Sequence, residues 1–196
     1  GGFQNALGAW QDAFLVKFGT AGNRLWATYY GGTGNEEVHS LDGLATDASG
    51  NVYLVGSTDN STGIASGGFQ NTYGGGFQDA FLVKFNPSGV RQWATYYGGT
   101  GDDAGYSVAA DGSGNVYLSG FTNSAASIAS GGFDNTYGGG GLNDAFLVKL
   151  NATTGARIWA TYCGGAGDDY GAGVATDASN NVYMGGQASS AAGIAS

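Results

Sequence analysis

The chain repeats itself three times, and this repetition constrains its fold more than any other feature. The segment Asp-Ala-Phe-Leu-Val-Lys begins at Asp12, Asp79 and Asp144, so its copies start 67 and 65 residues apart. Self-similarity at a fixed period of this length is typical of repeat architectures. The chain therefore divides into residues 1–66, 67–130 and 131–196. Other motifs keep the same spacing, with Trp-Ala-Thr-Tyr beginning at Trp26, Trp93 and Trp159 and Asn-Val-Tyr at Asn51, Asn115 and Asn181.

Each unit contains four apolar segments with the character of β-strands, and no window has the 3.6-residue period of a helix. In the middle of the chain these segments are 107–111, 116–121, 145–150 and 158–162. Their connections are short, long and short. The first short connection holds Gly50, Gly114 or Asn180 at one position, and these are residues that tolerate a positive φ. We therefore expect a tight hairpin turn there.

Both faces of these strands are apolar. In the third strand of the middle unit, Phe81, Val83 and Phe85 lie on one face and Ala80 and Leu82 on the other. A sheet exposed on one side would alternate apolar with polar residues, whereas four-stranded units buried on both faces are typical of propeller blades. We predict an all-β fold of β-propeller blades, built from three tandem, four-stranded antiparallel repeats of about 65 residues. Neighbouring units would supply each other's core.

The unit from Gly67 to Gly120 resembles the bacterial β-propeller repeat known as the SBBP repeat. It reads Gly-Gly-Phe-Gln-Asn-Thr-Tyr, then Asp-Ala-Phe-Leu-Val-Lys-Phe, then Trp-Ala-Thr-Tyr-Tyr-Gly-Gly-Thr-Gly-Asp-Asp, and finally Ala-Asp-Gly-Ser-Gly-Asn-Val-Tyr-Leu-Ser-Gly. The resemblance covers the whole chain, three times over. It implies propeller blades in large secreted or cell-surface proteins, usually without catalytic residues. An extracellular or cell-surface location is expected on this ground.

The units begin within a long loop, which splits one blade between the two chain ends. We expect an outer strand pair at about 12–32, whole blades at about 35–99 and 102–165, and an inner pair at about 168–187. Three blades are fewer than the four to eight of most closed propellers. The junction of Ser196 with Gly1 would also repeat the sequence found from Gly63 to Asn71. Head-to-tail association of copies into a ring or a filament is therefore expected, unless the chain is a segment of a longer repeat protein.

Charge and hydropathy exclude two classes of partner. The net charge is −9 and only six residues are basic, whereas nucleic-acid binding needs clusters of Lys and Arg. No apolar run approaches the roughly 20 residues of a membrane-spanning helix. The single Cys163 lies within an apolar strand, where we expect a small core residue.

An acidic bend follows the fourth strand of each unit. Its carboxylates could ligate calcium at one mouth of the propeller, or could instead accept backbone hydrogen bonds in a solvated turn. No copy has the loop of an EF-hand, and no other metal or cofactor is predicted. The candidate calcium ligands are Asp102, Asp103, Asp168 and Asp169.

Other repeated polar residues have structural interpretations. An aspartate opens the third strand of every unit, where it could tie down the long loop through backbone N–H groups. A repeated lysine in the same strand is expected to pack its stem on the sheet. His39 is the only histidine and lies where the first unit is three residues longer than the others. With no second histidine or cysteine nearby, we interpret it as a loop residue.

The leading functional prediction is a non-enzymatic structural or interaction module of an extracellular bacterial repeat protein, built for assembly or adhesion. An enzyme would need an unrepeated acid–base pair, and only the neighbourhood of His39 and Asp42 breaks the repeat. The alternative is a propeller that binds a glycan or calcium at its long-loop face, where aromatic rings could stack on sugars or pack on the blade. The candidate residues of that face are Glu36, Glu37, His39, Phe69, Tyr73, Phe133 and Tyr137.

Overall fold

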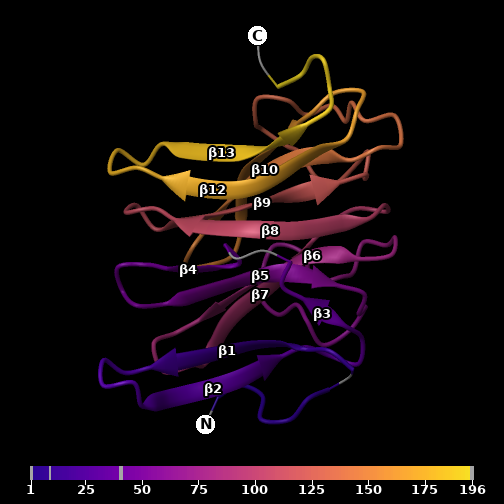
Figure 1. Ribbon diagram of the computed structural model, residues 1–196. Helices are drawn as coiled ribbons and strands as arrows, with labels where there is room; N and C mark the ends of the chain where they lie inside the picture. The colour runs from indigo at the N-terminus through magenta and orange to yellow at the C-terminus, as the bar shows by residue number, and fades with distance from the viewer. Residues whose placement is uncertain (1, 9, 40–41, 195–196) are drawn as a thin grey trace.

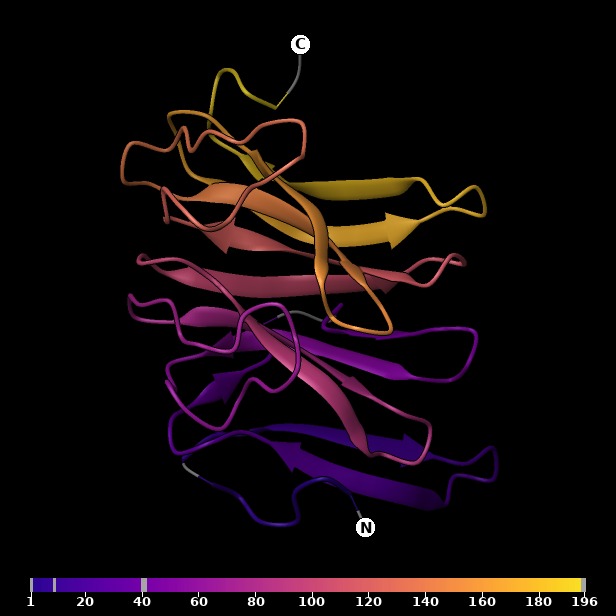
Figure 2. The same ribbon diagram turned by 180° about the vertical axis from the view of Figure 1, so that it is seen from behind.

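The computed structural model describes residues 2–8, 10–39 and 42–194 of the 196-residue chain. Its described part contains strands and turns and no helix, so no helix there is long and apolar enough to cross a membrane. The sheets stack from the N-terminus to the C-terminus, and the stack is open at both ends (Figures 1 and 2). The junction predicted between Ser196 and Gly1 lies outside the described residues.

Two complete antiparallel blades lie between two strand pairs. The first pair is β1 (Ala13–Phe18) with β2 (Arg24–Tyr30), and the last is β12 (Asp169–Thr176) with β13 (Val182–Ala188). These pairs and blades confirm the predicted fold class. The first blade contains β3 (Glu36–Glu37), β4 (Leu44–Thr46), β5 (Val52–Thr58), β6 (Asp79–Phe85) and β7 (Arg91–Tyr97). The second contains β8 (Asp103–Ala110), β9 (Asn115–Thr122), β10 (Asp144–Asn151) and β11 (Arg157–Cys163).

The innermost strands differ from the prediction. β8 begins at Asp103 and not at Ser107, because its pairing with β9 continues through an irregularity between Gly105 and Ser107. In the first blade the inner strand is divided into β3 and β4, which both pair with β5. The three extra residues of the first unit lie between these two pieces, so the insertion interrupts the strand that its counterparts keep continuous.

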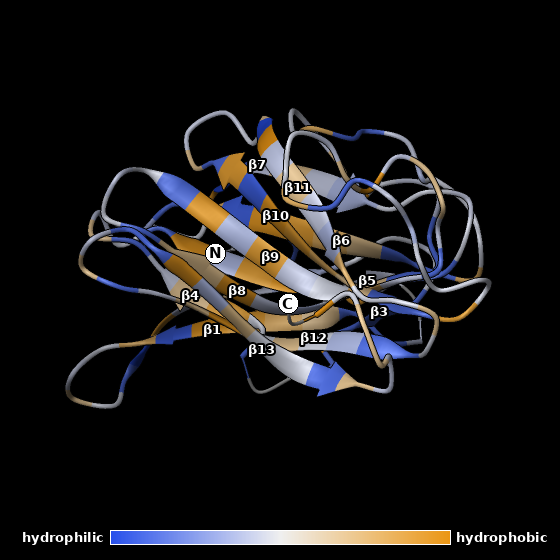
Figure 3. Cartoon of the chain, turned by 90° about the horizontal axis from the view of Figure 1, so that it is seen from above, coloured by the Kyte–Doolittle hydropathy of each residue, from blue (hydrophilic) through white to orange (hydrophobic). Residues whose placement is uncertain are grey.

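The strands bury both faces, as their sequence predicts. Phe81, Val83 and Phe85 pack with β1 and β2 in one apolar cluster, whereas Ala80 and Leu82 pack with the second blade in another. Figure 3 shows the hydrophobic residues along the strands and many of the hydrophilic ones in the loops at their ends. Each blade is therefore held by contacts with the blade on either side.

The tight turns have the predicted backbone geometry. The φ angles of Gly50, Gly114 and Asn180 are 75°, 81° and 63°, all in the left-handed region. In the turn of the second blade, Asp111 accepts hydrogen bonds from the backbone N–H groups of Ser113 and Asn115. The turn is thus fixed by one carboxylate and one residue that tolerates a positive φ.

Candidate functional site

The aspartate that opens each third strand ties down the long loop, as predicted. One carboxylate oxygen, Oδ2, accepts a hydrogen bond from the backbone N–H of a loop glycine four to six residues earlier, and this bond recurs in every unit. The acceptors and donors are Asp12 with Gly8 (2.8 Å), Asp79 with Gly74 (2.6 Å) and Asp144 with Gly138 (2.8 Å).

The second oxygen of the same aspartate faces another buried carboxylate. A Cβ placed on Gly98 would lie 2.5 Å from Asp79 Oδ1 and 2.8 Å from Asp103 Oδ2, so both oxygens approach one backbone position. Asp103 Oδ2 also accepts hydrogen bonds, while Asp79 Oδ1 is buried with no hydrogen-bond partner. We call two such facing acidic residues a carboxylate pair, and Asp79 with Asp103 is the middle one. The other two are Asp12 with Glu36 beside Gly31, and Asp144 with Asp169 beside Gly164.

Three members of the carboxylate pairs, Asp79, Asp103 and Glu36, hold protons at a higher pH than free carboxylates do. Burial raises the pKa of Asp79 to about 7, opposed by the Gly74 N–H and reinforced by the Asp103 carboxylate. Burial likewise raises the pKa of Asp103 to about 6 and that of Glu36 to about 7. A like charge beside a buried carboxylate disfavours ionisation, so a proton on Asp79 relieves the repulsion between Asp79 and Asp103.

The candidate calcium ligands separate into two groups. Asp102 and Asp168 accept hydrogen bonds from the backbone N–H groups of Phe77 and Asn143, and so hold the long loop. Asp103 and Asp169 are buried in the carboxylate pairs. Within the described residues, no three His, Cys, Asp or Glu side chains are grouped so that they could hold a metal ion.

His39 belongs to a polar cluster that the sequence did not reveal. Its Nε2 contacts the hydroxyl of Ser57, its Nδ1 lies 3.6 Å from Glu37 Oε2, and its ring packs edge-on against Tyr106. The order serine, histidine, carboxylate is that of a nucleophilic triad. Ser57, however, lies within β5 and is 2% exposed, which leaves its hydroxyl little access to a substrate. The sequence could have pointed to Ser57 only through its departure from the repeat, because the other units have Phe121 and Gln187 at this position.

Three of the four candidate aromatic residues of the long loop pack on the blades. Tyr73 lies edge-on against Tyr96, and Tyr137 is tilted against Tyr162. Phe69 contacts the ring of Tyr97 at a centroid distance of 6.1 Å. The fourth residue of the set, Phe133, is 87% exposed.

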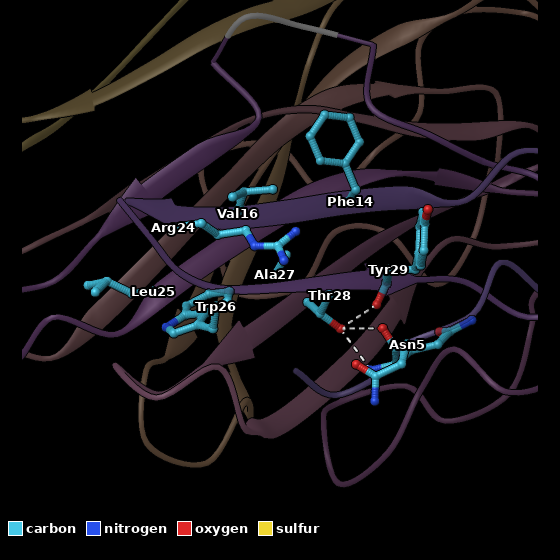
Figure 4. A pocket seen from close by; sticks show the side chains of 10 residues that line it. Asn5, Phe14, Val16, Arg24, Leu25, Trp26, Ala27, Thr28 and Tyr29 are labelled. Carbon is cyan, nitrogen blue, oxygen red and sulfur yellow. Dashed lines mark hydrogen bonds between the residues drawn. The ribbon is translucent and has the colours of Figure 1, made fainter. Parts of the chain in front are cut away.

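The open face of β1 and β2 contains a hollow of about 610 Å³ (Figure 4). Its lining includes Phe14 from β1 and Arg24 and Tyr29 from β2. Phe14 is 67% exposed, whereas the phenylalanines at the same position of the other units, Phe81 and Phe146, are fully buried. This face therefore has the composition of a blade interface without a blade against it.

Strand edges are open at both ends of the stack. β1 pairs with β2, and β13 pairs with β12, and neither has a second neighbour among the described strands. In the complete blades the equivalents of β13 and β1 pair with one another, as β5 with β6 and β9 with β10. The open edges of β13 and β1 are therefore the two edges that pair with each other in a complete blade.

A lysine and a tryptophan cross each internal junction. Lys17 Nζ and Trp26 Nε1 both donate to the carbonyl of Pro87, each at 3.0 Å. At the next junction, Lys84 Nζ and Trp93 Nε1 donate to the carbonyl of Ala152 at 2.7 and 3.1 Å. The repeated lysine thus anchors one blade to a turn of the next.

Comparison with known proteins confirms the resemblance to the SBBP repeat. The family model described as a beta-propeller repeat matches residues 92–125 and 158–191, so the chain carries repeats of this type. The chain is also 27% identical, over 171 residues, to an uncharacterized WD repeat-containing protein, L264, of Acanthamoeba polyphaga mimivirus. That alignment covers 81% of this chain, and the chain spans only 12% of that protein's length. Both similarities are to repeat proteins and support a repeat-based interaction module.

Proposed function

We propose that the chain is a non-enzymatic interaction module that joins head to tail with further copies of itself and serves assembly or adhesion outside a bacterial cell. The extracellular or cell-surface location is supported by the family resemblance. Self-association is supported by the two open ends, where each strand pair is half of a blade. A split blade completed by a second copy would have the strand order of the two complete blades.

The observation that carries the proposal is the matching register of the open edges. Inside the chain Gly56 pairs with Phe81, and Gly120 pairs with Phe146. The equivalent pair across two copies is Gly186 of β13 with Phe14 of β1. Glycine at this position leaves room for the aromatic ring beside it. Exposed strand edges also associate readily with complementary edges, because their backbone groups lack partners.

A second contact follows the same register. Lys84 Nζ lies 5.6 Å from the centre of the Tyr53 ring, and Lys149 Nζ lies 5.3 Å from that of Tyr117. In a completed split blade Lys17 would lie over Tyr183, which is exposed in the single chain. Lys17 and Tyr183 thus preserve a cation–π contact whose two halves lie at opposite ends of the stack.

The solution mass of the chain tests the proposal. Because the contact is between different surfaces of two copies, it produces a ring if the rotation closes and a filament if it does not. Light scattering or native mass spectrometry over a range of concentrations should show discrete multiples of 19.6 kDa for a ring, or an open distribution for a filament. A species that stays at 19.6 kDa at all concentrations would refute self-association.

A second candidate function is recognition of a glycan at the long-loop face. A hollow of about 420 Å³ there is lined by Phe69, Tyr73 and Arg157 among others. Aromatic rings beside hydrogen-bonding groups suit the apolar face and the hydroxyls of a sugar. A glycan array probed with and without calcium tests this function, and the absence of binding in both conditions would contradict it.

A further inference from the structure

The two junctions inside the chain are built alike around an arginine and a phenylalanine. The guanidinium carbon of Arg91 lies 4.3 Å from the ring centre of Phe3, and that of Arg157 lies 4.4 Å from the ring centre of Phe69. Such stacking is a cation–π contact between neighbouring units. The same guanidinium groups donate hydrogen bonds to the carbonyls of Ile64 (3.3 Å) and Ile128 (3.0 Å).

The third phenylalanine and the third arginine do not form such a pair within the described part of the chain. Phe133 is 87% exposed, against 42% for Phe3 and 38% for Phe69. Ile194, which closes the third unit, is also exposed. The remaining arginine, Arg24, lies on the open face of β1 and β2 (Figure 4). The phenylalanine and the arginine of one more junction are thus exposed at opposite ends of the stack.

One position makes this outer junction different from the inner ones. Tyr30 packs on Phe81 at a centroid distance of 5.4 Å, and Tyr97 stacks on Phe146 at 5.3 Å. Each tyrosine hydroxyl also donates to the carbonyl of the isoleucine that closes its unit. The third unit has Cys163 at this position, which supplies neither the ring nor the hydroxyl.

We propose that the open face of β1 and β2 packs against the surface around Phe133 and Cys163 of a second copy. We further propose that Cys163 makes this junction weaker than the internal ones. The inference rests on the proposed self-association and adds its contacts and its strength-determining residue. Arg24 stacks on Phe133 of the other copy, and Phe14 lies over Cys163 of that copy. Association between copies is therefore reversible under conditions in which the internal junctions stay closed.

Four variants of the full chain test the contacts by sedimentation velocity across a concentration series. Restoring the tyrosine in Cys163→Tyr should tighten association, because an aromatic pair and a buried hydrogen bond together correspond to roughly a ten- to hundredfold lower Kd. Arg24→Gln and Phe133→Ala should each weaken association. Leu25→Ala is the matched control, because Leu25 lines the same hollow while its equivalent in the middle unit, Gln92, stays exposed at an internal junction.

The outcomes separate this inference from the proposed function. Tighter association of Cys163→Tyr, weaker association of Arg24→Gln and an unchanged Leu25→Ala would support it. If the chain associates but none of these variants differs from wild type, the copies meet through other surfaces and the inference is wrong, while the proposed function stands. If neither wild type nor Cys163→Tyr associates, both are wrong. Because misfolded chains also aggregate, the tighter association of Cys163→Tyr counts only where the complexes are discrete, dissociate on dilution and keep the unfolding transition of wild type.

Discussion

Replacing Asp79 by asparagine removes one ionisable group from the middle carboxylate pair and keeps its shape. The amide oxygen can still accept the hydrogen bond of the Gly74 N–H. The amide nitrogen can donate to Asp103, as a protonated Asp79 would. The variant therefore imitates the protonated pair at every pH, and the difference between variant and wild type isolates the cost of ionising it.

The sign and size of the effect follow from the pKa of Asp79, which burial raises from 3.8 to about 7. Between these values the folded chain holds a proton that the unfolded chain has released, so wild-type stability falls as the pH rises and becomes level above the folded pKa. One unit of pKa corresponds to about 1.4 kcal/mol, so this group should remove about 3 kcal/mol of unfolding free energy between pH 5 and pH 8. Asp79→Asn should be close to wild type at pH 5 and more stable by about that amount at pH 8.

Urea denaturation at pH 5 and pH 8 measures this difference. Gln78→Ala is the matched control, because Gln78 directly precedes Asp79 and carries no titratable group. Its offset from wild type should be the same at both pH values. An Asp79→Asn variant equally destabilised at both pH values would refute the reasoning from the raised pKa of Asp79. So would calcium that stabilises wild type but not Asp79→Asn at pH 8, since a cation would then replace the proton.

Three further substitutions test other parts of the structure by chemical denaturation. Gly98→Ala should destabilise the fold by roughly 1–3 kcal/mol, because its Cβ would meet both carboxylates of the middle pair, and a stable variant would contradict that packing. Trp93→Phe removes the indole N–H that donates to Ala152, and should cost about 1–3 kcal/mol through the lost hydrogen bond and the lost contact area, although Lys84 still donates to the same carbonyl. Burial alone would raise the pKa of Asp111. The hydrogen bonds that its carboxylate accepts from Asn115, Ser113 and Tyr117 outweigh burial, so the pKa lies below its usual value. Asp111→Asn should therefore be destabilised at neutral pH by about 1–3 kcal/mol, and the difference from wild type should shrink as the pH falls into the acid range. A difference that grows on acidification would refute this sign.

The repeat predicts most of the fold because each unit supplies independent evidence for the same four strands. Two-sided apolar strands such as 81–85 require a neighbour on each face, and this requirement predicts the stacking of blades before any contact is known. The conformation of Asn180 was predictable for the same reason, since glycine occupies its position in the other units. The tie between Asp79 and the long loop followed from the position of that residue at a strand start.

Features that depend on contacts between strands far apart in a unit were not predictable from the sequence. The acidic bend reads as two adjacent surface carboxylates, yet Asp102 caps a loop and Asp103 is buried opposite Asp79. Strand pleating separates the two neighbours, and the side on which each falls depends on where β8 begins. The sequence suggested a later start for that strand, so it hid the burial of Asp103. The contact of His39 with Ser57 was hidden by the insertion that divides the inner strand.

The departures from the repeat carry more functional information than the repeat itself. A side chain that recurs in all three units serves the blade or the junction between blades, and such a role is the same at every junction. Cys163 departs from the repeat at the one junction that the chain does not complete by itself. Ser57, on β5, and His39, between β3 and β4, depart from it together in the first blade. Under the proposed self-association, Cys163 would weaken the contact between copies, while the internal junctions keep the packing of Tyr30 and Tyr97.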